Sequence, residues 1–183
     1  MSERIINAIQ ASLQTNIEKI NINDPALNTP IHPEQVDPLA QAAIPTILLG
    51  TLVKLTHIHP EHLMQVNGLS FEKVFGGKCE AVAQSIAAYA GSSSAQAASY
   101  ADTGFEALNA YLHNELDGDI IALRSELESG QNSILSYLPA GVNMGNTLKL
   151  DTIDDRTHKM EGILSSLANY LFNEDIKTDA TKK

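Results

Sequence analysis

Apolar residues recur every three or four positions along most of this 183-residue chain, which is the spacing of one face of an α-helix. The first such run predicts a helix over residues 6–20, whose apolar face is formed by Ile6, Ile9, Leu13, Ile17 and Ile20. Three prolines among Asn and Asp predict a loop or linker over residues 21–36. No stretch alternates between apolar and polar residues for long enough to indicate a sheet, so the pattern predicts an all-α protein.

The most apolar predicted helix covers residues 38–55. Asp37 and Pro38 favour a helix start, because Asp caps free backbone N–H groups and proline suits the first helical position. Pro45 cannot donate a backbone hydrogen bond, so we expect a kink or a break into two shorter helices there. The next helix is expected to run from Pro60 to Gly68.

The middle of the chain is rich in alanine and predicts two helices, residues 78–90 and 95–114, separated by Gly91 and three capping serines. Small alanines let helices approach closely, so we expect this pair to form the buried centre of the fold. The spacing of the larger residues predicts a core of Val82, Ile86, Phe105, Leu108 and Leu112.

Beyond Asp117 the spacing predicts a helix that ends at Gly130 and a short one that ends at Pro139, followed by a loop over residues 139–151. The clearest amphipathic helix comes last, with an apolar stripe of Ile153, Met160, Ile163, Leu164, Leu167 and Leu171. Such a stripe is buried either against the protein's own core or against a partner, and both alternatives stay open. The predicted architecture is a compact bundle of short helices plus this C-terminal helix.

The predicted helices group into an N-terminal helical segment, residues 1–70, and a main helical domain, residues 71–176. Residues 177–183 have almost no apolar anchor and are expected to form a disordered tail. One continuous domain is the alternative.

Three short motifs follow one another in residues 75–148: Phe75-Gly76-Gly77 before the alanine-rich helix, Gly91-Ser92-Ser93-Ser94 before the next, and Leu138-Pro139-Ala140-Gly141. In this order they resemble the YidB-like domain of unknown function, a bacterial family. The resemblance implies a helical fold and no reaction, since that family has no established activity. The run Ile-Pro-Thr-Ile-Leu-Leu-Gly at residues 44–50 resembles another family motif, which raises the hypothesis of two similar helical halves.

Charge and targeting signals narrow the function classes. The chain has 12 Lys plus Arg against 22 Asp plus Glu, which gives a net charge of −10. Binding the phosphates of a nucleic acid needs clustered cations, so this charge disfavours a nucleic-acid partner. No secretory signal precedes the first helix, and the apolar stretch over residues 44–55 is shorter than the ~20 residues that span a bilayer. We therefore expect a cytoplasmic protein without a nucleic-acid partner or a membrane span.

Two places carry candidate chemistry. His57, His59 and His62 lie close together beside Glu61, and imidazole and carboxylate groups are ordinary metal ligands. The alternative is a histidine-flanked loop at a helix start. Cys79, the single cysteine, excludes a disulfide framework; it is either a thiol activated at a helix start or a buried core residue.

The sequence favours a protein that is not an enzyme, needs no cofactor, and acts through a protein partner or its own homo-oligomer. The alternative is a metal-binding protein or a metal-dependent enzyme that uses the His57–His62 segment.

Overall fold

The computed structural model describes residues 3–20, 30–140 and 142, and in these residues the protein is all-α. An isolated antiparallel bridge joins Ile20 to Pro30. The helices are α1 Arg4–Leu13, α2 Pro38–His57, α3 Pro60–Leu63, α4 Phe71–Phe75, α5 Cys79–Ala90, α6 Ser94–Leu116 and α7 Ile120–Tyr137, with short 3-10 helices at Pro33–Gln35 and Gly76–Lys78. The prediction of an all-α multi-helix fold is confirmed.

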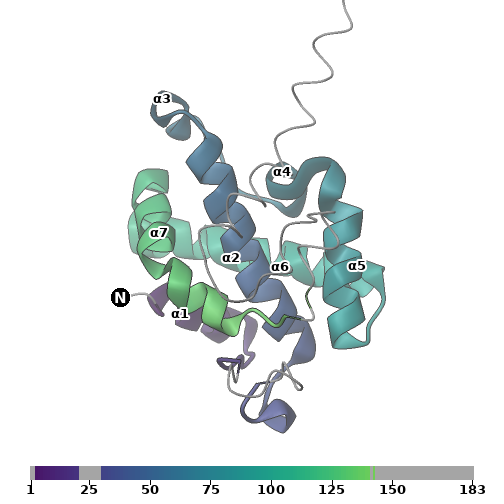
Figure 1. Ribbon diagram of the computed structural model, residues 1–183. Coiled ribbons are helices and arrows are strands. Elements are labelled where there is room, and N and C mark those ends of the chain that lie inside the picture. The colour runs from purple at the N-terminus through teal and green to yellow at the C-terminus, as the bar shows by residue number, and fades with distance from the viewer. Residues whose placement is uncertain (1–2, 21–29, 141, 143–183) are drawn as a thin grey trace, which may run out of the picture.

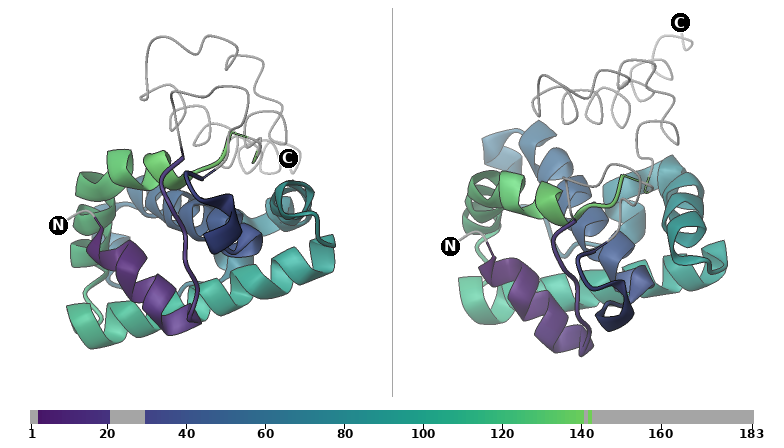
Figure 2. Two further views of the ribbon diagram at one scale, coloured as in Figure 1. Left: turned by 90° about the horizontal axis from the view of Figure 1, so that it is seen from below. Right: turned by 60° about the horizontal axis from the view of Figure 1, so that its bottom comes forward.

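Helix α2 runs through the middle of the molecule (Figure 1). It packs against α5, α6 and α7, and α4 adds a shorter contact. The long helix α6 crosses behind it, and α1 lies along α6 (Figure 2). Every residue of α2 from Ala40 to Val53 is buried, which fits a helix that is apolar on all sides.

Length and composition alone would allow α2 to cross a membrane, and within the described part of the chain it is the one helix that meets this criterion. Most of its apolar length is buried inside the protein. In this fold α2 therefore acts as the central core helix, and the absence of a membrane span stays a prediction.

The core predicted from the alanine-rich helices is confirmed, because its side chains are almost inaccessible: Val82 1%, Ile86 0%, Phe105 2%, Leu108 0% and Leu112 8% exposed. Helices α5 and α6 pack closely on each other, as their small residues indicate. The same core also contains residues of α1 and α2, so it extends across the expected boundary between residues 70 and 71.

Several helix ends lie where the sequence predicts them. Asp37 caps α2 by accepting hydrogen bonds from the backbone N–H groups of Leu39 and Ala40. Ser93 caps α6 in a capping box with Gln96, and Gly91 ends α5 in the left-handed conformation with φ of 64°. Asp37 and Ser93 satisfy free backbone groups with their side chains, and Gly91 adopts a conformation that other residues avoid, which is why local sequence was enough to find these ends.

The first predicted helix is wrong in its second half, because α1 ends at Leu13. Gln14 adopts the left-handed conformation with φ of 51°, and the chain beyond it is extended. The Gln10 side chain accepts a hydrogen bond of 2.7 Å from the Ile17 backbone N–H, which fixes this exit. Ile17 is only 4% exposed, so it belongs to the core although it lies beyond the helix. Its position at helical spacing is why the sequence pattern extended the predicted helix too far.

Two further predicted helix ends are wrong, and of the two alternatives at Pro45 the break is excluded. Helix α2 continues through Pro45 as one helix, and α7 continues through Gly130, which is buried. The helix expected to reach Gly68 ends at Leu63 after a single turn. A proline or a glycine costs an interior helix about 3 or 1 kcal/mol, whereas burying one large aliphatic side chain returns about 1.5–3 kcal/mol. Packing of the buried side chains therefore outweighs the local preference in α2 and α7.

The predicted C-terminal helix with its apolar stripe, most of the loop over residues 139–151 and the tail over residues 177–183 lie outside the described residues.

Gly50 permits the close approach of α2 and α4, since a Cβ atom at this position would overlap the Phe75 ring. That ring cannot simply move aside, because it packs against Phe71 and Phe105 at centroid distances of 5.3 and 6.5 Å. We expect Gly50→Val to lower the free energy of unfolding by about 1–3 kcal/mol through overpacking, measured by chemical denaturation. Gly77→Val is the control, because no atom lies within 4 Å of its Cβ position. Equal losses in the two variants would contradict the close contact.

Candidate functional site

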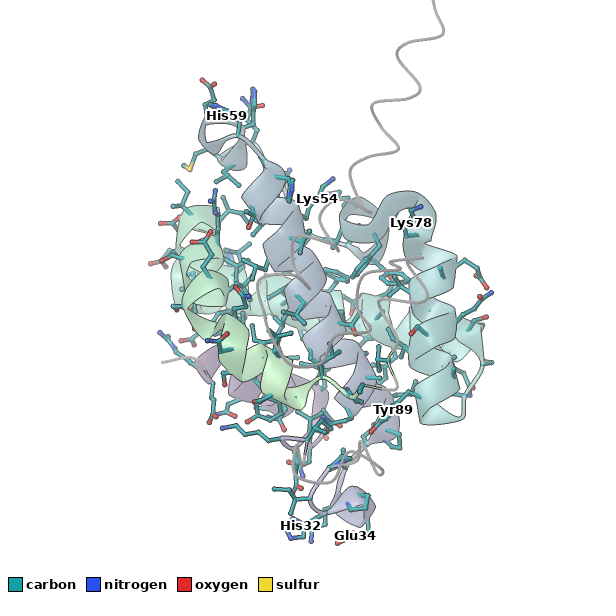
Figure 3. All side chains as sticks on the ribbon, in the orientation of Figure 1. His32, Glu34, Lys54, His59, Lys78 and Tyr89 are labelled. Carbon is teal, nitrogen blue, oxygen red and sulfur yellow. The ribbon has the colours of Figure 1, made fainter. Side chains whose placement is uncertain are left out.

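The predicted histidine segment lies at one end of the molecule, where α3 projects beyond the body and carries His59 at its start (Figure 3). His59 Nδ1 is 3.0 Å from Glu61 Oε1, and both side chains are about 70% exposed, 69% and 71%. The rings of His59 and His62 meet edge to face at a centroid distance of 6.3 Å. His57, at the end of α2, places its Nδ1 2.9 Å from the Val53 carbonyl oxygen.

The structure therefore brings His59 near Glu61 and His62, while the His57 ring contacts its own helix. No group of three or more His, Cys, Asp or Glu side chains in the described ranges is arranged to hold a metal ion. The metal site at His57, His59 and His62 stays a prediction.

Cys79 lies at the start of α5, half-buried against the core. Its thiol donates to the Phe71 carbonyl oxygen and to the Glu72 carboxylate, both at 3.4 Å. Burial, together with the neighbouring Glu72 carboxylate, raises the pKa of the Cys79 thiol to about 12. This environment disfavours the thiolate, which is the opposite of what a cysteine nucleophile needs.

Gln41 is a polar side chain in the centre of the core, 0% exposed, and the sequence analysis did not single it out. Its Nε2 donates to the carbonyl oxygens of Glu18 and Tyr137 at 2.9 and 2.6 Å. Its Oε1 accepts from the Glu18 backbone N–H at 2.9 Å. One side chain thus connects the extended segment after α1, the helix α2 and the end of α7.

Asn109 of α6 makes a second connection of this kind. Its amide group donates to the Leu69 carbonyl oxygen at 2.7 Å and accepts from the Leu69 N–H at 2.9 Å. The segment between α3 and α4 is thereby attached to the core although it has no regular structure. A lone amide residue within an apolar helical run is the signal that could have indicated both Gln41 and Asn109.

Tyr111 anchors α6 to α7 and to α1. Its hydroxyl lies 2.8 and 2.9 Å from the two carboxylate oxygens of Glu126, and the Arg4 guanidinium stands 5.9 Å from its ring centroid. Burial and the hydrogen bond to Glu126 raise the pKa of the Tyr111 hydroxyl to about 12. The hydroxyl therefore stays protonated at neutral pH and acts as a hydrogen-bond donor.

Three sides of α2 meet different helices. Ile47 faces α6, where it meets Gly104, Gly50 faces Phe75 of α4, and Gln41 reaches the end of α7. The remaining side carries Ala42, Pro45, Leu49 and Leu52, spaced three and four residues apart. We call these four residues the fourth side of α2.

Figure 1 shows α2 between α7 and α5, with α6 behind it. The side chains of the fourth side are buried: Ala42 is 0%, Leu49 2% and Leu52 3% exposed. Thr56 continues the same spacing at the end of α2 and is exposed. The fourth side is thus an apolar strip inside the protein, and it ends where Thr56 reaches the surface.

Thr51 lies one turn after Ile47 and therefore on the side of α6. Its hydroxyl oxygen is buried and has no hydrogen-bond partner within the described part of the protein.

Comparison of the chain with protein-family models, with curated proteins and with solved structures finds no match. The resemblance to the YidB-like family stays a prediction.

The environment of Cys79 leads to a prediction about its reactivity. A pKa raised from 9.0 to about 12 reduces the thiolate fraction at pH 8 by about 1,000-fold, and only the thiolate reacts. We expect iodoacetamide to modify native Cys79 at least ~100-fold more slowly than an exposed thiol of ordinary pKa. The control is Ala88→Cys in a Cys79→Ser background, because Ala88 is exposed on the same helix. Similar rates at the two positions would contradict the raised pKa of Cys79.

Gln41 gives a prediction about stability. Gln41→Met keeps the length of the side chain but leaves the Glu18 N–H and two carbonyl oxygens without their partner. We expect the free energy of unfolding to fall by at least about 2 kcal/mol, measured by urea denaturation. Gln84→Met is the control, because Gln84 is exposed and bonds only to Glu80 on its own helix, so a change within about 0.5 kcal/mol is expected. A similar small change at Gln41 would contradict its role as a connection.

Proposed function

We propose that the protein is a non-catalytic, self-assembling interaction module, in which the apolar stripe of residues 153–171 makes the contact between copies. The observation that carries the proposal is how the polar groups of the core are used. Gln41 and Asn109 bind the chain's own backbone, and Cys79 has a pKa too high for a nucleophile. These side chains hold the fold together, and a group that is already committed in this way is poorly placed to act on a substrate.

The described surface supports the stripe as the contact element. The large apolar side chains that are exposed there are Ile31 at 60%, Met64 at 73% and Ile121 at 48%. They come from three separate segments, and isolated apolar residues of this kind are normal on a protein surface. An amphipathic stripe of five or six large aliphatic side chains offers far more apolar area, so it is the stronger candidate for a protein contact.

The test is the mass of the full chain, measured by light scattering from micromolar to millimolar concentration. The mass of the wild type should rise towards twice the chain mass. The double variant Leu164→Glu with Leu167→Glu should stay monomeric, because two charges in the stripe cannot be buried in a contact.

The matched control is Ser165→Glu with Asn169→Glu, which places the same charges on the opposite face and should assemble as the wild type does. Circular dichroism checks that each variant folds, and the milder pair Leu164→Asn with Leu167→Asn replaces the first if it does not. A wild type that stays monomeric throughout, or a control that dissociates equally, would overturn the proposal.

A further inference from the structure

The segment between α3 and α4 contains Asn67 followed by Gly68, which is the one Asn-Gly pair in the sequence. The Asn67 side chain is exposed, and Gly68 adopts the left-handed conformation with φ of 70°. Within the part of the chain that the structure describes, neither the Asn67 side chain nor the Gly68 N–H has a hydrogen-bond partner. No competing contact therefore keeps these two groups apart.

The space around Gly68 is open. A Cβ atom at this position would meet nothing nearer than Lys73 Nζ at 4.0 Å, and glycine has no side chain to obstruct an approach to its nitrogen. An asparagine side chain is short enough for its Cγ to reach the backbone nitrogen of the next residue, and this contact closes a five-membered ring. The pair is therefore sterically suited to form a succinimide.

Lys73 of α4 contacts the peptide group that joins the two residues. Its Nζ donates to the Asn67 carbonyl oxygen at 2.7 Å and to the Gly68 carbonyl oxygen at 3.3 Å. The Asn67 carbonyl oxygen and the Gly68 N–H belong to one resonant peptide group, so the negative charge left when this N–H loses its proton is shared with that oxygen. A positively charged donor at the oxygen stabilises this anion.

We propose that Asn67 is a site of spontaneous deamidation and that Lys73 accelerates the reaction by stabilising the anionic peptide group. Hydroxide removes the proton of the Gly68 N–H, and the nitrogen attacks Asn67 Cγ. The N–Cγ bond forms, the Cγ–Nδ2 bond breaks, and Nδ2 takes a proton from water and leaves as ammonia. Water then opens the succinimide at one of its two carbonyl carbons, which leaves either aspartate or isoaspartate at position 67.

Lys73 also favours one of the two products. Its hydrogen bond polarises the main-chain carbonyl of residue 67, so water attacks there and breaks the bond to the Gly68 nitrogen, which gives isoaspartate with its free carboxylate beside Lys73. Isoaspartate lengthens the main chain by one atom just before Leu69. Leu69 is 5% exposed and both of its backbone groups are bonded to Asn109, so the change acts directly on the attachment of this segment to α6.

The test measures deamidation of residue 67 in the folded full chain at mildly alkaline pH, by peptide mass spectrometry with chromatographic separation of the two products. Lys73→Met should slow the reaction by about 5–10-fold and lower the share of isoaspartate, because an exposed charge-assisted hydrogen bond is lost. Lys73→Arg keeps the charge and should retain most of the rate. Asn114, exposed on α6, is the internal control, and its rate should be the same in all three chains.

Urea separates the effect of the fold from that of the local sequence. In the unfolded chain Lys73 no longer lies at the Asn67 carbonyl oxygen, so the wild type and Lys73→Met should react at the same rate. Equal rates in the folded proteins, a faster variant, or a difference of equal size in urea would overturn the role of Lys73. An Asn67 that stays intact in the folded chain and reacts in urea would overturn the site itself. Circular dichroism checks that each variant folds, and Lys73→Gln replaces Lys73→Met if that variant does not.

Discussion

The helix α2 is apolar on all of its sides, and a helix of that kind is stable in water only when other apolar groups surround it. Each large aliphatic side chain that it buries contributes about 1.5–3 kcal/mol, so the helix as a whole outweighs the loss at Pro45 by a wide margin. The other helices are arranged to meet this requirement. Gly50 and Gly104 let Phe75 and Ile47 fill the contacts with α4 and α6, where a side chain on either glycine would collide.

The side-chain amides of Gln41 and Asn109 attach the irregular segments to the core by hydrogen bonds, whereas the helices are held by apolar packing. A segment without regular structure has unpaired backbone groups, and placing such groups against a core costs free energy unless they find hydrogen bonds. Gln41 supplies these bonds to Glu18 and Tyr137, and Asn109 supplies them to Leu69. The position of α2 therefore fixes the path of the chain before it and the end of α7 after it. The same side chain holds the end of α7 against the start of α2.

The sequence predicted the fold well where local chemistry decides the structure. The caps at Asp37 and Ser93 were found because one side chain satisfies nearby backbone groups, and the core around Phe105 was found because helical spacing survives packing. The break at Pro45 and the helix end at Gly130 do not occur, because burial against distant residues outweighs a local preference. The candidate site was less predictable still. Gln41 binds residues that are 23 and 96 positions away, and no pattern near it reveals those partners.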